Sequence, residues 1–131
     1  TGIARWAVAV YPLGADSMPP AQAAYCAAEQ GKFFEYHDTL FQSQAHRHGR
    51  DDLIRIGTEI KLRMEPFKKC LDSTAMREKV QKLAKAASAL GVNSTPTFYV
   101  GDLKIKGGQS VPVFEEAIQQ KLKDKGKACR S

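Results

Sequence analysis

The chain has 131 residues, a length typical of one domain with a single core, and this excludes a multidomain assembly. Apolar residues make up 43% and charged residues 26% of the chain, which argues against a disordered or fibrous protein. The net charge is +6, but the densest basic stretch, 121–130, contains no aromatic residue to stack on a base. We therefore expect no nucleic-acid partner. We also expect no membrane partner, because no uninterrupted apolar run reaches the roughly 18–20 residues that cross a bilayer.

Residues 3–11 form a β-branched and aromatic run that ends at Pro12, and this pattern predicts a mostly buried strand. The next region, 17–91, is predicted to be helical, with Ser17 as a capping residue and Gly91 as the stop. Helices are expected within it at about residues 21–30, 33–41, 51–60, 67–71 and 75–90. The spacing of apolar residues therefore indicates a helical region after the first strand.

Residues 95–122 are predicted to form a hairpin and a final helix. Two short apolar runs, 97–100 and 103–105, flank Gly101 and Asp102, which leaves room only for a tight turn. The final helix is expected to end near residue 122, and 123–131 to be a flexible basic tail. We expect the whole chain, 1–131, to form a single domain.

The aromatic residues Trp6, Phe33, Phe34, Phe41 and Phe98 are predicted to belong to the hydrophobic core. His37 is expected to pack or hydrogen-bond within its helix, since no nucleophile lies beside it in the sequence. His46 and His48 are two imidazoles without a nearby third ligand, a pattern typical of a solvated loop. We therefore expect neither a metal site nor a cofactor.

The cysteines are Cys26, Cys70 and Cys129. Their spacing fits neither a zinc knuckle nor a CxxC motif, and three cysteines allow at most one internal disulfide. Buried free cysteine behaves as a small apolar side chain, so core packing is one interpretation of Cys26 and Cys70.

Three segments resemble one known family. Residues 23–41 resemble the helical region of the DsbA-like thiol-disulfide oxidoreductases of the thioredoxin superfamily. Residues 90–100 are similar to that family's loop and strand with a cis-proline, and residues 107–118 fit its final helix. The resemblance implies a thioredoxin-like α/β fold with a helical insertion, truncated at the amino-terminal βα unit.

The resemblance also implies functional residues. Thr95 and Pro96 match the position where thioredoxin-like proteins pair their backbone with an extended polypeptide. Some relatives join a pair matching Cys26 and Cys70 as a structural disulfide in an oxidising compartment, which here implies an extracytoplasmic, periplasmic setting. Two unbonded core thiols remain the alternative.

The family's catalysis requires a CxxC at the start of a helix, where one thiolate attacks and the other resolves the mixed disulfide. No CxxC occurs in the 131 residues, so we expect no catalytic residue here. One hypothesis is a non-catalytic or peptide-binding DsbA-like protein. The alternative is a fragment of an active oxidoreductase whose redox motif lies upstream or on another chain; glutathione-dependent isomerases or transferases are a more distant possibility.

The family arrangement places a central strand between the segments matched by 3–11 and 97–100. Without that strand, unpaired backbone groups would face a gap. The segments 3–11 and 97–100 could pair directly with each other, or a second copy could cover the exposed surface; we expect the second, a homodimer.

Overall fold

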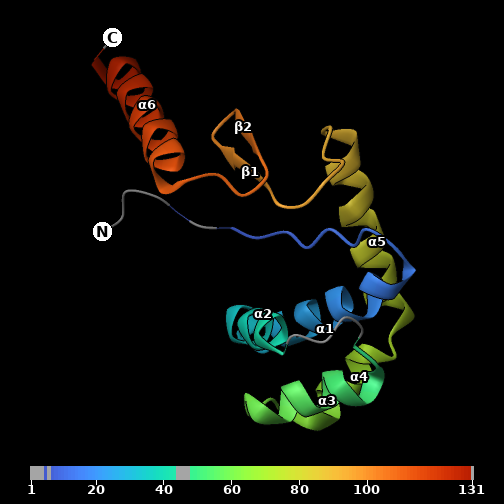
Figure 1. The fold of residues 1–131 in the computed structure, drawn as a ribbon. Helices are drawn as coiled ribbons and strands as arrows, with labels where there is room; N and C mark the ends of the chain where they lie inside the picture. The colour runs from blue at the N-terminus through green and yellow to red at the C-terminus, as the bar shows by residue number, and fades with distance from the viewer. Residues whose placement is uncertain (1–4, 6, 44–47, 131) are drawn as a thin grey trace. The chain divides into compact units, whose positions relative to one another are not determined.

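We describe the protein from a computed structural model, in which residues 5, 7–43 and 48–130 are described (Figure 1). The chain divides into two compact units, one made of residues 9–89 and the other of residues 1–8 and 90–131. The first contains helices, and the second contains a β-hairpin and one helix.

The helical unit contains the 3-10 helix η1 (Ala15–Ser17) and the helices α1 (Met18–Ala28), α2 (Phe33–Gln42), α3 (Arg50–Glu59), α4 (Met64–Leu71) and α5 (Thr74–Ala89). Two starts differ from expectation. Ser17 directly precedes α1, as expected of a capping residue, but its hydroxyl donates back to the Gly14 carbonyl at 2.8 Å and not into α1. Helix α3 begins before Asp51, because the Asp52 carboxylate accepts the Gly49 N–H at 3.2 Å and caps that end.

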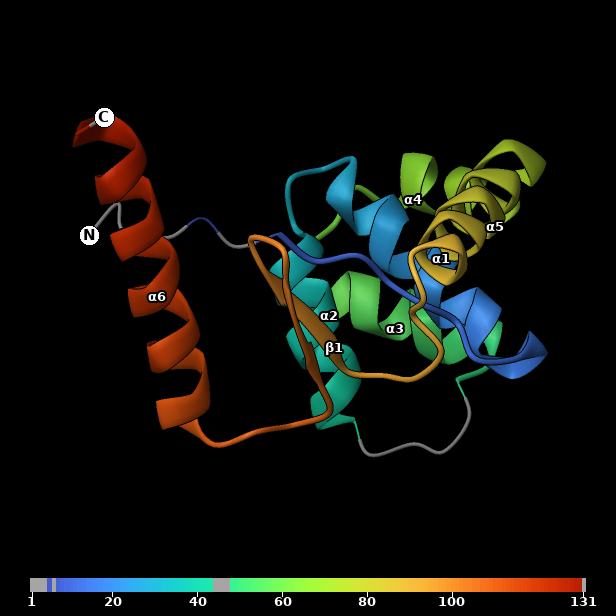
Figure 2. The same cartoon turned by 90° about the horizontal axis from the view of Figure 1, so that it is seen from above.

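Helix α1 lies at the centre of this unit and contacts α2, α3, α4 and α5 (Figure 2). Its buried residues include four alanines, each at most 2% exposed, namely Ala21, Ala23, Ala24 and Ala27. Small side chains on several faces let neighbouring helices approach closely. The large core side chains come from the other helices and include Tyr36, Leu53, Ile56, Phe67 and Val80.

Two predictions from the sequence are wrong in this region. Residues 7–11 form no strand, since a strand needs backbone partners and the Val10 N–H instead donates to the Tyr25 hydroxyl at 3.1 Å. Phe34 and Phe41 are not core residues, because they are 47% and 72% exposed. Phe34 and Phe41 lie seven residues apart and therefore share one face of α2. Tyr36 lies about 200° around the helix axis from Phe34, on the opposite face, and is buried. Trp6 lies outside the described residues.

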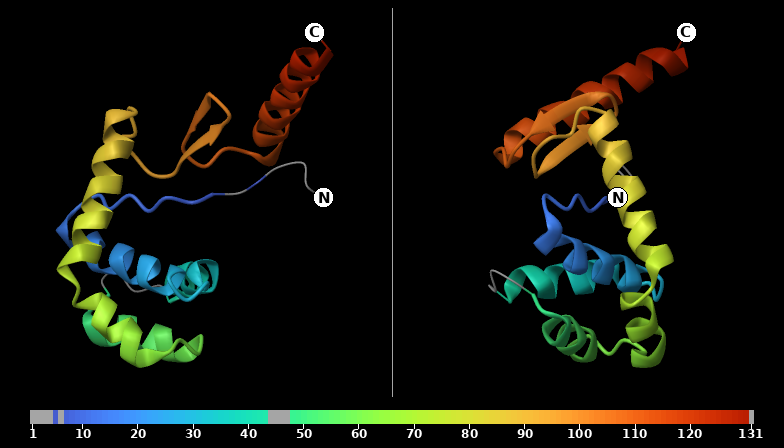
Figure 3. Two further views of the ribbon diagram at one scale, coloured as in Figure 1. Left: turned by 180° about the vertical axis from the view of Figure 1, so that it is seen from behind. Right: turned by 90° about the vertical axis from the view of Figure 1, so that its right-hand side faces the viewer.

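The second unit contains β1 (Thr97–Val100), β2 (Leu103–Lys106) and α6 (Val111–Arg130), which lies alongside the hairpin (Figure 3). The strands are antiparallel, and Val100 pairs with Leu103 across the Gly101-Asp102 turn. Gly101 has φ +63°, a conformation that glycine adopts without strain.

The prediction that the final helix ends near residue 122 and that 123–131 form a flexible tail is wrong as far as residue 130. Helix α6 continues to Arg130. Two side-chain contacts, each spanning about one turn of α6, support the longer helix. Gln120 Nε2 donates to Asp124 at 3.1 Å, and Lys121 Nζ lies 3.5 Å from the same carboxylate. Lysines near a helix carboxyl end also favour its dipole.

Candidate functional site

Thr95 and Pro96 lie in the loop that leads into β1. Both residues are exposed, and the peptide bond between them is cis. Thr97 Oγ1 donates to the Ser94 carbonyl at 2.7 Å, and the Gly107 N–H donates to the Pro96 carbonyl at 2.8 Å. These two hydrogen bonds fix the loop from both sides while leaving Thr95 at the surface.

The start of this loop is bound to the hairpin. The Tyr99 hydroxyl donates to the Leu90 carbonyl at 3.1 Å, and Lys104 Nζ donates to the Gly91 carbonyl at 2.8 Å. One residue from each strand therefore holds the chain that precedes the loop.

The tip of the hairpin is joined to α6. Lys121 Nζ forms an ion pair with Asp102, and this hydrogen bond holds the pKa of the Asp102 carboxyl below its usual value. A Cβ on Gly101 would come within 3.2 Å of Lys121 Cδ, so the lysine stem passes close beneath the turn. Phe98 of β1 meets Phe114 of α6 edge-on, with ring centroids 4.8 Å apart.

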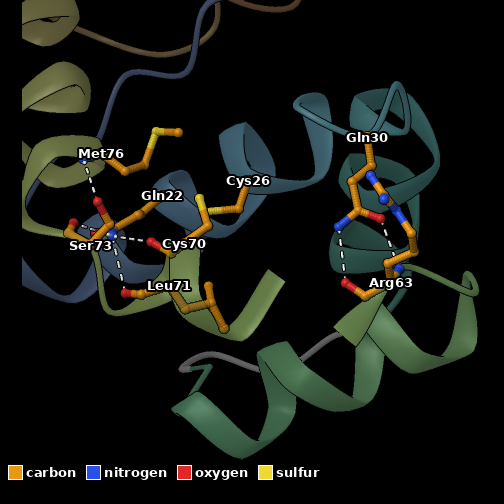
Figure 4. Close-up of a disulfide and its surroundings, with 8 residues drawn as sticks. All are labelled: Gln22, Cys26, Gln30, Arg63, Cys70, Leu71, Ser73 and Met76. Atoms are coloured by element: carbon orange, nitrogen blue, oxygen red, sulfur yellow. Dashed lines mark hydrogen bonds between the residues drawn. A yellow bond between two sulfur atoms is a disulfide. The ribbon is translucent and has the colours of Figure 1, made fainter. Parts of the chain in front are cut away.

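The cysteine pair lies in the helical unit. Cys26 of α1 is 1% exposed, and it forms a disulfide with Cys70 of α4, with Cα atoms 5.8 Å apart (Figure 4). This distance falls within the roughly 4.4–6.8 Å that disulfides span. The bond belongs to the packing of α1 on α4, and neither cysteine lies at a helix start.

Gln22, one turn before Cys26, makes a cluster of polar contacts that the sequence did not reveal. Its Nε2 lies 3.1, 3.0 and 3.0 Å from the carbonyl oxygens of Cys70, Leu71 and Ser73 (Figure 4). The last carbonyls of a helix have no partners within it, so this amide satisfies the end of α4. A polar residue among the alanines of α1 was the available signal.

Gln30 and Arg63 form a second contact of this kind. The Arg63 N–H donates to Gln30 Oε1 at 2.8 Å, while Gln30 Nε2 donates to the Arg63 carbonyl at 3.1 Å (Figure 4). The side-chain amide thereby pairs with backbone as another strand would. It fixes the start of α4 against the end of α1.

The described histidines contact aromatic rings or hydrogen-bonding side chains close to them in the sequence. The His37 ring lies between Phe33 and Phe41, with centroid distances of 5.8 and 4.5 Å, and its Nδ1 is 3.3 Å from Asp38. His48 Nε2 is 2.6 Å from Ser43 Oγ, while His46 lies outside the described residues. Within the described part of the chain, no three His, Cys, Asp or Glu residues are grouped to hold a metal ion.

The chain is similar to known thiol-disulfide proteins. A thioredoxin family model matches residues 1–120. A thioredoxin-like oxidoreductase from Silicibacter pomeroyi DSS-3 superposes with a TM-score of 0.71 and 26% identity, over 85% of this chain and 64% of that one. Disulfide bond formation protein D of Bacillus subtilis is 29% identical over 100 residues, which cover 71% of this chain and 44% of that protein.

The chain is also similar to part of some Na(+)/H(+) antiporters. The NhaA antiporter of Herminiimonas arsenicoxydans is 38% identical over 87 residues, which cover 66% of this chain and 14% of the antiporter. NhaA 3 of Salinispora tropica is 31% identical over 98 residues, 75% of this chain and 15% of the antiporter. This chain thus corresponds to a small portion of each antiporter and to less than half of the Bacillus protein. Among the described residues, no helix combines the length and apolarity needed to span a bilayer.

The family match covers residues 1–120, and the superposition on the structural neighbour covers 85% of the chain. The chain belongs to the thioredoxin family, in its DsbA-like group, and has a thioredoxin-like fold with a helical insertion.

Proposed function

We propose that this chain binds extended polypeptide at the exposed loop formed by Thr95 and Pro96, and that it does not itself exchange dithiols. The observation that carries the proposal is the combination of an accessible loop leading into β1 with cysteines that are engaged in packing. Cys26 and Cys70 are joined to each other, and the sequence contains no CxxC.

Polypeptide would bind through the backbone. Thr95 is exposed and lies two residues before β1, and within the described residues no backbone hydrogen bond occupies its N–H or its C=O. Backbone recognition tolerates many side chains, which suits a protein that acts on unfolded substrates.

Insulin reduction tests the catalytic half of the proposal. We expect the rate to equal that of a simple monothiol at the same concentration, and the residual rate to disappear in Cys129→Ser. Turnover comparable to thioredoxin that persists in Cys129→Ser would contradict the proposal.

Two substitutions at one position test the binding half. Thr95→Pro removes the backbone N–H, whereas Thr95→Ala keeps it and removes only the side chain. We expect the proline variant to bind reduced, carboxymethylated lactalbumin about tenfold more weakly, and the alanine variant to bind it normally. Equal binding by both variants would show that the Thr95 backbone is not the contact.

The second candidate is that these residues are the polypeptide-binding portion of a larger thiol-disulfide oxidoreductase, whose redox motif lies outside the 131 residues. It is favoured by coverage, since the chain matches 64% of the Silicibacter oxidoreductase and 44% of the Bacillus disulfide bond formation protein. An in-frame CxxC in the gene upstream of Thr1 would support this candidate. Continuous non-coding sequence there would exclude an upstream source for the motif.

We also propose an extracytoplasmic setting. The disulfide between Cys26 and Cys70 supports it, because such bonds persist in oxidising compartments and are rare where glutathione keeps thiols reduced. Alkylating free thiols in cells that are denatured at once with acid and detergent tests this: both cysteines should remain unalkylated although burial no longer shields them.

A further inference from the structure

A pocket of about 260 Å³ lies within the helical unit. It is surrounded by the starts of α1 and α3, the end of α4 and the first turn of α5. All of its lining residues fall within residues 9–89, so one unit forms the whole pocket. Pockets for drug-sized ligands usually measure about 300–1,000 Å³, so this one suits a smaller molecule.

The buried part of the pocket is mainly apolar. Leu53 of α3 lines it and is 2% exposed, and Leu71 of α4 lines it and is partly buried. Gln22 is the polar residue there and is 5% exposed, but its Nε2 already donates to the carbonyls of Cys70, Leu71 and Ser73 (Figure 4). That amide nitrogen is therefore occupied, and a ligand would meet chiefly apolar side chains here.

Two of the exposed lining residues form an ion pair. Arg50, the first residue of α3, donates from Nε and Nη2 to the two carboxylate oxygens of Asp72, at 3.1 and 2.8 Å. This hydrogen bonding holds the pKa of the Asp72 carboxyl below its usual value, so the carboxyl is charged at neutral pH. The two charges balance each other, and the pair fixes the start of α3 against the end of α4.

Arg77 brings a further positive charge to the pocket. It lies in the first turn of α5, which contains no acidic residue. Its guanidinium has no hydrogen-bond or ion-pair partner in the part of the chain that the structure describes. The start of a helix carries a partial positive charge, and guanidinium binds carboxylates through two parallel hydrogen bonds. Both features favour an anion beside Arg77.

We propose that this pocket binds the carboxylate of a small aliphatic acid, with Arg77 holding the carboxylate and the aliphatic chain lying against Leu53 and Leu71. A single negative charge is preferred to the double charge of sulfate or phosphate, because Asp72 also lines the pocket and repels anions. No residue of the loop at Thr95 takes part, so this site is independent of the proposed polypeptide binding.

The probe is the branched-chain acid isovalerate, with isovaleramide as its uncharged counterpart of the same shape. Binding is measured by NMR titration of the whole isotope-labelled chain. We expect isovalerate to shift the amide signals around Leu53 and Leu71, and isovaleramide to leave them in place. Equal shifts with both compounds, or no shift at these positions, would overturn the proposal.

Shorter and more highly charged anions test the two halves of the ligand. Each buried methylene contributes about fourfold in affinity, so we expect acetate to bind at least about tenfold more weakly than isovalerate. Sulfate should also bind more weakly than isovalerate. Equal affinity for acetate and isovalerate would refute the apolar contact, and tighter binding of sulfate would refute the preference for one charge.

Two substitutions in α5 test the role of Arg77. Arg77→Gln and Lys79→Gln each remove one positive charge from an exposed position, but only Arg77 lines the pocket. We expect the Arg77 variant to bind isovalerate about tenfold more weakly and the Lys79 variant to bind it like the parent chain. Equal weakening would show that net charge alone attracts the acid. Circular dichroism checks that both variants remain folded.

A free acid and the carboxyl terminus of a polypeptide that ends in an aliphatic residue present the same group. Acetyl-Gly-Leu, with its carboxyl-terminal amide as the control, represents the second source. Tighter binding of acetyl-Gly-Leu than of isovalerate, abolished in the amide, supports the site and identifies a polypeptide terminus as its ligand. Weaker binding supports the site for a free acid, and binding of neither compound would show that the proposal is wrong.

Discussion

Tyr36 shows how one side chain couples folding to pH. Its side chain is fully buried, and its hydroxyl donates to the Leu53 carbonyl at 3.0 Å, which fixes α2 against α3. Burial disfavours the charged phenolate and raises the pKa of Tyr36 above its ordinary value. The folded protein therefore holds this proton at a pH where the unfolded chain releases it.

We predict that the free energy of unfolding falls as the pH rises above about 10, the ordinary tyrosine pKa. The sign follows because the unfolded chain binds fewer protons than the folded one in that range. Tyr36→Phe should lower stability by about 1 kcal/mol at neutral pH and make the alkaline decline shallower. Urea unfolding from about pH 7 to about pH 11 measures both effects.

Tyr11→Phe is the matched control, since its hydroxyl contacts Ser88 Oγ at an exposed position. We expect this variant to keep the alkaline decline of the parent chain. Parallel curves for Tyr36→Phe and the parent would show that Tyr36 ionises as freely in the folded state as in the unfolded one.

Gln22 and Tyr36 also show what a sequence leaves out at this scale. Both residues lie in helices that were predicted, but their partners are backbone carbonyls 17 or more residues away. A carbonyl carries no side-chain identity, so the pattern of residue types cannot mark it as the acceptor. Only the packing angle between helices determines which carbonyl is reached.

At the scale of elements, α3 and α4 meet at Gly57. A Cβ at this position would lie 2.8 Å from Phe67 Cε1 and 3.4 Å from Leu62 Cδ1. Phe67 is fully buried, so its ring has no open space into which it could move. The glycine is therefore required for the approach of the two helices.

We predict that Gly57→Ala lowers the free energy of unfolding by about 1–3 kcal/mol, because overpacking outweighs the better helix propensity of alanine. Gly126→Ala is the control, since Gly126 lies in α6 and a methyl group added there would meet no other atom within 4 Å. That change should leave stability unaltered or raise it slightly. Thermal unfolding followed by circular dichroism compares the two, and equal effects would contradict the steric explanation.

The disulfide joins α1 to α4 across a sequence separation of 44 residues. A cross-link over a loop of this length removes conformations from the unfolded chain, and the chain-entropy model gives about 4 kcal/mol. We predict a loss of that order in the double variant Cys26→Ala with Cys70→Ala, measured by urea unfolding.

The parent chain with reductant serves as the control and should approach the double variant. If the variant matches the oxidised parent instead, the bond contributes nothing to stability. In that case Cys26 and Cys70 act only as two small core side chains.

For the whole molecule, the order of helices, hairpin and final helix follows from the sequence because amphipathic spacing and turn residues are local signals. The sequence prediction was wrong where a segment's structure depends on contacts with other residues. Residues 7–11 have strand-forming side chains, yet side-chain preference does not supply a neighbouring strand. The end of α6 was missed for the opposite reason, because contacts between Lys121, Gln120 and Asp124 prolong a segment that composition describes as a tail.

Only part of the candidate site could be predicted from the sequence. Thr95 and Pro96 were located by resemblance, and the structure adds their exposure and their hydrogen-bonded neighbours. The homodimer stays a prediction, and light scattering at micromolar concentration measures it.

The link between α1 and α4 also has a consequence for a cleaved chain. A protease that cuts once between Cys26 and Cys70 produces two pieces that remain one covalent molecule. On a non-reducing gel such a nicked chain would migrate near the intact protein, and adding a thiol would separate it into two bands. Protease damage within the helical unit is thus retained in the molecule and becomes visible only on reduction.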